Sequence, residues 1–228
     1  MKAMILAAGR GERLRPLSDR LPKPLVPAGG KPLVAWLLER LSRAGIREVV
    51  MNVSHLGAQI EAALGDGAAF GLAIAYSREA EPLESAGGIA LARALLGDAP
   101  FLLVNADVYS DFDLGTLRAH ALGNDLAHLV LAPNPSHHPG GDFSLAGARA
   151  GNAPGPRYTY TGMALIDPTL VAPVRAGAKA PLAPLLRAAA DAGRLSGELH
   201  RGLWRDVGTA ERLAELDRLL EARTRAAT

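Results

Sequence analysis

The segment from Leu6 to Lys23 combines two glycines with several cations, which are the residue types that bind phosphate groups. Gly9 and Gly11 let the backbone turn tightly and approach a ligand where a Cβ would obstruct it. Positive charges follow along the chain at Arg10, Arg13, Arg15 and Lys23. Because backbone amides and fixed cations together suit clustered phosphate oxygens, this segment predicts a binding loop for a polyphosphate.

The same residues also suit an ordinary turn from a strand into a helix with solvated arginines, since short glycine patterns are weak signals. The pattern is not a dinucleotide-binding fingerprint, which would need a glycine in place of Leu14. It is not a Walker loop either, because Gly30-Lys31 is followed by Pro32 rather than by Ser or Thr. The glycines by themselves therefore leave the ligand open.

Two aspartates stand where a sheet would present them to a ligand. Asp107 follows the apolar run Phe101–Asn105, and Asp206 lies between an expected strand and the last expected helix. In open α/β sheets, ligands bind beyond the carboxyl ends of the strands. A turn-forming role for Asp107 and a helix-entry role for Asp206 are the simpler alternatives.

The elements that must position these residues alternate along the chain. Apolar runs predict strands at Ala3–Leu6, Glu48–Val53, Ala73–Tyr76, Phe101–Asn105, Leu129–Leu131 and Tyr158–Ile166. Helical spacing appears at residues 33–41, 60–64 and 114–117, with further helices expected at 181–192 and 208–223, the last with Thr209 as its N-cap. This alternation predicts an α/β layered domain with a mostly parallel central sheet. Residues 133–157 are rich in Pro, Gly, Asn, His and Ser, which predicts a loop-rich insertion around a short strand near Phe143.

Composition excludes several classes of protein. The chain has 228 residues, of which 49% are hydrophobic, so it can bury a sizeable core. No apolar run approaches the roughly 20 residues of a membrane span, and the run at the start is too short for a signal peptide. The formal charge is +2, and only four Phe, four Tyr and two Trp could stack on bases, so nucleic acid is not an expected partner. The absence of cysteine is consistent with a cytoplasmic location.

A longer pattern surrounds the two glycines. It reads Leu6-Ala-Ala-Gly-x-Gly-x-Arg-Leu-x-Pro-Leu17, followed by Pro22-Lys-Pro-Leu-x-Pro27. This pattern resembles the signature of the sugar-phosphate nucleotidylyltransferases. The resemblance extends from Lys2 to about Leu220, and it implies a three-layer Rossmann-like (GT-A-like) fold in which residues 1–228 form a single nucleotidyltransferase domain.

The resemblance implies a reaction and roles for particular residues. A sugar 1-phosphate would attack the α-phosphorus of a nucleoside triphosphate and release pyrophosphate, with Mg²⁺ as cofactor. Arg13 would hold the leaving phosphates, and Lys23 would bridge the two reacting phosphates. Asp107 and Asp206 would hold Mg²⁺, because family members carry Gly-Asp after the central strand and Trp-x-Asp-x-Gly-Thr near the end. Here Ala106 replaces the glycine of the first motif.

The resemblance also implies contacts to each substrate. The nucleotide would meet Ala8, Gly9, Gly11, Glu12, Arg13, Lys23, Gly87 and Gly88, with the last two glycines facing a pyrimidine edge. The sugar phosphate would meet Asn105, Gly140 and Asp142. His137 and His138 have no third partner at a suitable spacing, so they are expected to be a solvated loop pair rather than metal ligands.

Within the family, the short form of the chain and the segment Glu81-Pro-Leu-Glu84 resemble a bacterial group that transfers a uridylyl group from UTP to N-acetylmuramate α-1-phosphate in peptidoglycan recycling. Two alternatives stay open. One is a pyrimidine nucleotidyltransferase acting on glucose or mannose 1-phosphate, and the other is an inactive nucleotide-sugar sensor. No pattern in the sequence indicates the oligomeric state.

Overall fold

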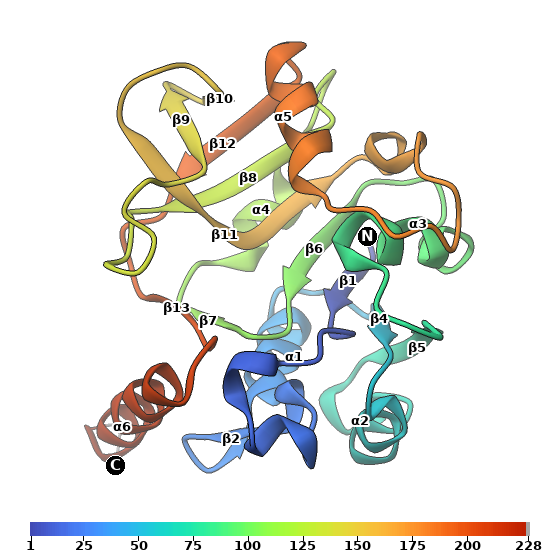
Figure 1. Ribbon diagram of the computed structural model, residues 1–228, viewed down its shortest axis with the longest axis vertical. Helices are drawn as coiled ribbons and strands as arrows, with labels where there is room; N and C mark the ends of the chain where they lie inside the picture. Colours follow the sequence, from blue (N-terminus) through green and yellow to red (C-terminus); the bar gives the residue numbers. More distant parts are fainter. Residues whose placement is uncertain (227–228) are drawn as a thin grey trace.

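One nine-stranded sheet runs through the molecule, in the order β5-β4-β1-β6-β11-β8-β12-β10-β9 (Figure 1). The computed structural model describes residues 1–226, with side chains described as far as Arg223. The sheet is formed by β1 (Ala3–Leu6), β4 (Glu48–Val53), β5 (Ala73–Arg78), β6 (Phe101–Asn105), β8 (Ala127–Ala132), β9 (Phe143–Ala146), β10 (Arg149–Gly151), β11 (Arg157–Ile166) and β12 (Leu195–Leu199). Two small ribbons accompany it, β2 (Pro27–Ala28) with β3 (Lys31–Pro32), and β7 (Val108–Ser110) with β13 (Trp204–Asp206). The α/β fold predicted from the alternation of elements is confirmed.

The two halves of the sheet differ in strand direction. Strands β5, β4, β1 and β6 are all parallel, so their carboxyl ends share one edge. Strand β11 is antiparallel to both of its neighbours, β6 and β8. The chain passes from β8 to β11 through the insertion at residues 133–157, which contains no helix, and antiparallel neighbours need no crossover helix. The sheet is therefore parallel mainly in its first half and mixed in its second.

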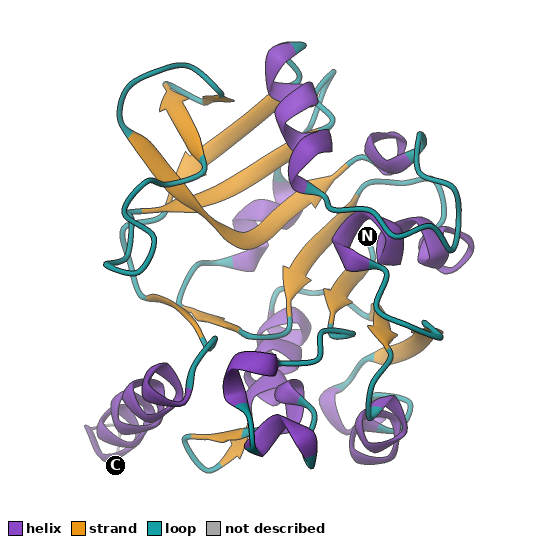
Figure 2. Cartoon of the chain, viewed as in Figure 1, coloured by secondary structure: helices purple, strands orange, loops and turns teal. Residues whose placement is uncertain are grey.

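Helices cover both faces of the sheet and give three layers (Figure 2). They are α1 (Leu33–Arg43), α2 (Gly57–Leu64), α3 (Glu84–Leu96), α4 (Leu114–Ala119), α5 (Ala183–Asp191) and α6 (Ala210–Ala226). Successive strand residues point to opposite faces. Ile5 accordingly packs with the residues of α1, α2 and α4, while Met4 packs with those of α3 and α5.

The insertion at residues 133–157 extends the edge of the sheet. The short strand expected near Phe143 is present as β9, and it forms a hairpin with β10 that the sequence did not indicate. Its inward side is anchored by Phe143, which is buried beneath the guanidinium of Arg187. The segment is thus part of the sheet at one end and loop at the other.

The last helix connects the C-terminal region to the first loops of the chain. Leu216 and Leu220 of α6 pack on Ala28 and Leu33, which follow the phosphate-loop segment. The hydroxyl of Thr209 accepts a hydrogen bond from the Arg212 amide at 3.4 Å, which agrees with its expected role as N-cap. This packing brings the start of α6 close to the carboxyl edge of the sheet.

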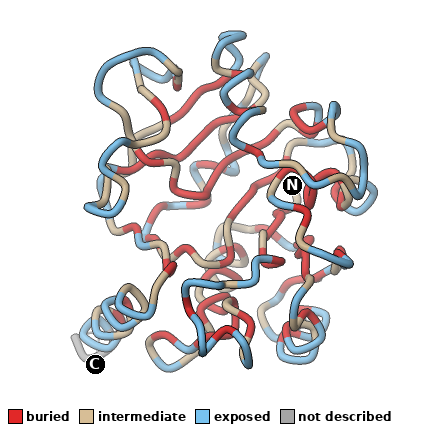
Figure 3. The backbone as a smooth tube through the Cα atoms, viewed as in Figure 1, coloured by how far each residue is buried: buried red, intermediate tan, exposed pale blue. Residues whose placement is uncertain are grey.

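The buried residues follow the strands and the inner sides of the helices (Figure 3). Among the described residues, no helix has the length and apolar character needed to cross a membrane.

His128 in β8 makes the stability of the protein sensitive to acid. Its ring is buried, stacks on His120 with 3.8 Å between ring centroids, and contacts Ser196 and Glu198. Burial and the neighbouring His120 lower the pKa of His128 below its usual 6.5, although Glu198 and Asp125 oppose this shift. The unfolded chain therefore binds more protons, and the free energy of unfolding falls as the pH drops below about 6.5.

We expect His128→Gln to flatten this decline, measured by urea unfolding between about pH 7.5 and about pH 5.5. The exposed His55, changed to Gln in the same way, serves as the control. An unchanged slope in the His128 variant would show that another group governs the acid response.

Candidate active site

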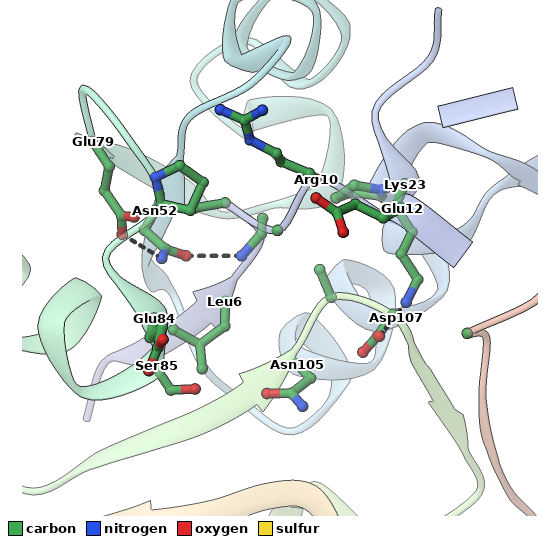
Figure 4. Close-up of a pocket in the computed structure, with 18 of the residues that line it drawn as sticks. Leu6, Arg10, Glu12, Lys23, Asn52, Glu79, Glu84, Ser85, Asn105 and Asp107 are labelled. Atoms are coloured by element: carbon green, nitrogen blue, oxygen red, sulfur yellow. Dashed lines mark hydrogen bonds and ion pairs between the residues drawn. The ribbon is translucent and has the colours of Figure 1, made fainter. Parts of the chain in front are cut away.

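A cavity of about 840 Å³ opens at the carboxyl edge of the parallel strands. Strands β1, β4 and β6 end at this cavity, and the loops that follow them supply its walls (Figure 4). The lining includes Leu6 to Arg13, Lys23, Pro24, Asn52, Glu79, Glu81, Pro82, Glu84, Ser85, Asn105, Ala106, Asp107, Lys179 and Gly208. The sequence predicted ligand binding at this edge, and the phosphate-loop residues and Asp107 do line it.

The phosphate loop turns at Gly11, which has a φ of +65°. A Cβ added there would lie 3.2 Å from the Cβ of Ser18, and the Ser18 hydroxyl donates a hydrogen bond to the Gly11 carbonyl at 2.8 Å. A glycine is therefore required both by the backbone conformation and by the packing. At Gly9, an added Cβ would meet nothing within 4 Å, so the backbone faces the open cavity.

Lys23 and Asp107 form an ion pair inside the cavity (Figure 4). Lys23 begins a short 3-10 helix, Lys23–Leu25, whose Pro24 and Leu25 are buried, and Asp107 follows β6. The side chain of Lys23 is only 13% exposed, against 29% for Asp107. The structure thus brings together two residues 84 positions apart that the sequence assigned to the same reaction.

Asp206 faces a second cavity rather than the first. This second cavity has a volume of about 730 Å³, and its lining includes Asp206, His137, Arg212 and Arg13, the last of which also lines the first cavity. Arg212 donates to both carboxylate oxygens of Asp206, at 2.7 and 2.5 Å, and to His137 Nε2 at 2.7 Å. His137, expected to be solvated, is therefore held by an arginine that the sequence did not single out.

The two aspartates lie close together, with Asp206 at the end of β13 and Asp107 in the turn between β6 and β7. Asp206 is opposite Val108 in the β7–β13 ribbon, and the Val207 amide donates to the Asp107 carbonyl at 2.8 Å. Within residues 1–226, no group of three or more His, Cys, Asp or Glu side chains could hold a metal. Two carboxylates with access to water nevertheless suit Mg²⁺, which takes one or two protein carboxylates and completes its shell with phosphates and waters. The two carboxylates therefore fit a Mg²⁺ ion whose other ligands are phosphate oxygens of a substrate and water molecules.

A buried polar network behind the phosphate loop was missed from the sequence. The Asn52 side chain accepts a hydrogen bond from the Ala7 amide at 2.8 Å and donates to Glu79 at 2.6 Å. Glu79 also accepts from the Leu83 amide at 2.8 Å. Asn52 is a polar residue near the end of an apolar strand, and this interruption was the sequence signal that could have indicated the network. The network ties the turn after β1 to the turn before α3 (Figure 4).

The contact of Gly87 and Gly88 with a base stays a prediction, and the structure shows how the two glycines are packed. Both are buried in α3 and neither lines the cavity. The Gly87 amide donates to the Ala180 carbonyl, and a Cβ on Gly88 would lie 2.6 Å from Glu79 Oε1. Their missing side chains serve close packing. The exposed face of this turn is instead formed by Glu81 and Glu84, with Glu84 at a φ of +61° and 3.7 Å from Lys179.

Gly87→Ala should destabilise the protein, because the added methyl would overlap the Ala178 carbonyl and lie 3.0 Å from Leu83 Cβ. We expect a loss of about 1–3 kcal/mol in the free energy of unfolding, measured by urea denaturation. Gly140→Ala is the matched control, because its methyl would meet nothing within 4 Å. Equal stability of both variants would contradict the packing role.

Of the three residues assigned to the sugar, the structure places one in the cavity. Asn105 lines it, at the end of β6. Gly140 and Asp142 line neither cavity. Asp142 accepts a hydrogen bond from the Tyr160 amide at 2.8 Å and pairs with His138 at 3.1 Å, so its carboxylate anchors the insertion loop to β11. Asp142 therefore has a structural role in this loop, and the contact of the loop with the sugar stays a prediction.

Comparison with known proteins identifies relatives that are nucleotidyltransferases. A family model described as nucleotidyl transferase matches residues 2–139. The N-acetylmuramate alpha-1-phosphate uridylyltransferase of Neisseria meningitidis serogroup B is 51% identical over 229 residues, which cover 97% of this chain and 99% of that protein. The glucose-1-phosphate thymidylyltransferase of Streptomyces griseus is 31% identical over 96% of this chain and 66% of its own length.

The fold is shared with solved structures at low sequence identity. A putative glucose-1-phosphate thymidylyltransferase from Bacillus anthracis, in complex with a sucrose, superposes with a TM-score of 0.87 at 20% identity, covering 97% of this chain and 95% of that one. The match of the family model to more than half of the chain, together with the relative that is half identical over almost its whole length, confirms the family predicted from the phosphate-loop pattern. The chain belongs to the nucleotidyl transferase family.

Proposed function

We propose that this protein transfers a uridylyl group from UTP to N-acetylmuramate α-1-phosphate, giving UDP-N-acetylmuramate and pyrophosphate. The observation that carries the proposal is the 51% identity to the Neisseria enzyme over 97% of this chain. The cavity supports it, since it joins a glycine-rich loop, a buried lysine and a carboxylate at the edge of a parallel sheet.

In this proposal, the loop from Ala8 to Arg13 binds the triphosphate. The backbone at Gly9, which is open to the cavity, and the turn at Gly11 donate amides to phosphate oxygens, and Glu12 lies beside them. Arg13 lines both cavities, so it can stabilise the pyrophosphate as it leaves.

Lys23 holds the reacting phosphates together. Its ammonium group lies between the phosphate loop and the end of β6, and it is largely shielded from water. A sugar phosphate dianion is already a nucleophile, so no general base is needed. The rate then depends on alignment and on charge stabilisation, and a shielded cation is effective at both.

Asp107 and Asp206 would hold Mg²⁺ in this proposal, together with phosphate oxygens and water. The bound ion supplies neutralisation of the charge that develops on the transferred phosphoryl group. In the described structure, Lys23 and Arg212 keep these two carboxylates in fixed positions.

Glu81 and Glu84 are placed to select the base. Both residues line the first cavity, and Glu84 lies on the side away from Asp107 (Figure 4). Carboxylates accept hydrogen bonds, so they suit the N3–H of uracil and disfavour cytosine, whose N3 is itself an acceptor. We infer from these two carboxylates a preference for UTP over CTP. We also propose that the reaction belongs to the cytoplasmic recycling of peptidoglycan.

The test is release of pyrophosphate by the purified protein with Mg²⁺. UTP, dTTP, CTP and GTP are each offered with N-acetylmuramate, N-acetylglucosamine, glucose and mannose 1-phosphates. Turnover with UTP and the muramate substrate is the expected result. Turnover confined to dTTP and glucose 1-phosphate would favour the second candidate function, a pyrimidine nucleotidyltransferase acting on glucose 1-phosphate. The 31% identity to the Streptomyces thymidylyltransferase is the observation that supports this candidate. No turnover with any pair would favour a nucleotide-sugar sensor.

A further inference from the structure

The second cavity carries excess positive charge that the proposed reaction does not use. Four arginines line it, Arg13, Arg201, Arg205 and Arg212, against two carboxylates, Asp206 and Glu215, for a formal charge of +2. Arg13 belongs to the phosphate loop, and Arg212 is engaged by Asp206. Arg201 and Arg205 therefore remain to be explained.

These two arginines have free donors. Both residues are exposed, and within the described part of the chain no side-chain hydrogen bond or ion pair is found for Arg201. Arg205 donates to the adjacent Trp204 carbonyl at 2.8 Å, which leaves most of its guanidinium available. A guanidinium presents several N–H groups in a rigid fork that matches the two oxygens of a carboxylate.

The second cavity adjoins the place where the sugar must lie. Asp206 of this cavity is opposite Val108 in the β7–β13 ribbon, and the next residue, Val207, donates its amide to the carbonyl of Asp107, which lines the first cavity. Arg13 lines both cavities. On the proposed function, the nucleotide occupies the side of the first cavity near Asn52 and Glu81. A sugar whose 1-phosphate is at Lys23 then extends toward β7 and β13, where the second cavity begins.

We propose that Arg201 and Arg205 form a subsite for a carboxylate carried by the sugar, which is the lactyl carboxylate of N-acetylmuramate. This inference rests on the proposed function. The subsite distinguishes a sugar with an anionic substituent from neutral hexosamines of otherwise equal shape. In this proposal, the residues that recognise the sugar substituent lie in β13 and the loop before it, rather than in the loop around Asp142.

Steady-state kinetics with three sugar 1-phosphates tests the subsite. The substrates are N-acetylmuramate 1-phosphate, its lactyl methyl ester, which keeps the size but loses the charge, and N-acetylglucosamine 1-phosphate, which lacks the lactyl group. Arg201→Gln and Arg205→Gln should each raise KM for the muramate substrate about tenfold, which corresponds to loss of one charge-assisted hydrogen bond. KM for the ester and for the glucosamine substrate should not change.

The control is Arg218→Gln, which removes the same charge from α6 at a position that lines neither cavity. Its KM values should match those of the unmodified protein. Because Arg201 and Arg205 are exposed, their variants should also keep the thermal unfolding midpoint.

Two results would overturn the subsite while leaving the proposed function intact. One is a variant that keeps the preference of the unmodified protein for the muramate substrate over its ester. The other is a rise in KM for UTP alone, which would make the second cavity part of the pyrophosphate path. Failure of the unmodified protein to use the muramate substrate at all would reject the proposed function and the subsite together.

Discussion

Lys23→Ala should lower kcat by about 10²–10³-fold, the usual cost of removing one preorganised charge that stabilises a transition state. Lys23 pairs with Asp107, its side chain is only 13% exposed, and its ammonium group is directed into the first cavity. Loss of the side chain removes both the alignment of the two phosphates and the neutralisation of their charge. KM for UTP should rise less than kcat falls, because several backbone amides still bind the triphosphate.

Lys31→Ala is the control for this experiment. Lys31 is also a partly buried lysine that pairs with a carboxylate, Glu39, and it stacks over the Trp36 ring at 3.7 Å. It lines neither cavity, so its loss should leave kcat unchanged. Circular dichroism verifies that both variants are folded. A Lys23 variant with near-normal turnover would remove the lysine from the mechanism.

Asp107→Asn should reduce turnover by a similar factor, about 10²–10³-fold, and should raise the Mg²⁺ concentration needed for half-maximal rate. An amide has the shape of a carboxylate but not its charge, so it binds Mg²⁺ weakly. It also leaves Lys23 without its anionic partner. The side chain is partly exposed, and its backbone carbonyl still accepts from Val207, so the fold should persist.

Asp111→Asn serves as the matched control for Asp107. Asp111 follows β7 and pairs with His200 at 3.0 Å, outside the lining of either cavity. Its replacement should leave both kcat and the Mg²⁺ requirement unaltered. If both aspartate variants lose activity equally, the loss reflects disturbance of the β6–β7 region rather than a role of Asp107 at the metal.

Much of the fold follows from local patterns. The runs Glu48–Val53 and Phe101–Asn105 were predicted as strands with the bounds that the structure shows, since each is a short and mostly apolar segment of a buried sheet. Helix α1 follows from the spacing of its buried leucines. The pairing of β9 with β10 could not be predicted, because β10 is only the short segment Arg149–Gly151 and the pairing depends on an open sheet edge.

In the candidate site, too, some features could be predicted from the sequence and others could not. The loop from Ala8 to Arg13 could be predicted, because its residues stand in an extended pattern that is typical of phosphate binding. The ion pair of Lys23 with Asp107 could not, because the two residues are 84 positions apart in the chain. The contact of Asp142 could not, because a carboxylate in a loop serves equally well to bind a sugar or to hold a backbone amide. Which of the two occurs depends on where β11 lies.

The sequence by itself determined the α/β alternation, the phosphate loop and the identity of the charged residues, because these depend on the spacing of residues close together in the chain. The tertiary structure alone decided that Asn52 and Glu79 support the loop, that Gly87 and Gly88 are packed rather than exposed, and that Asp206 faces a second, cationic cavity. These contacts join segments that are far apart in the chain. Their distances follow from strand order and helix packing, which no local pattern encodes.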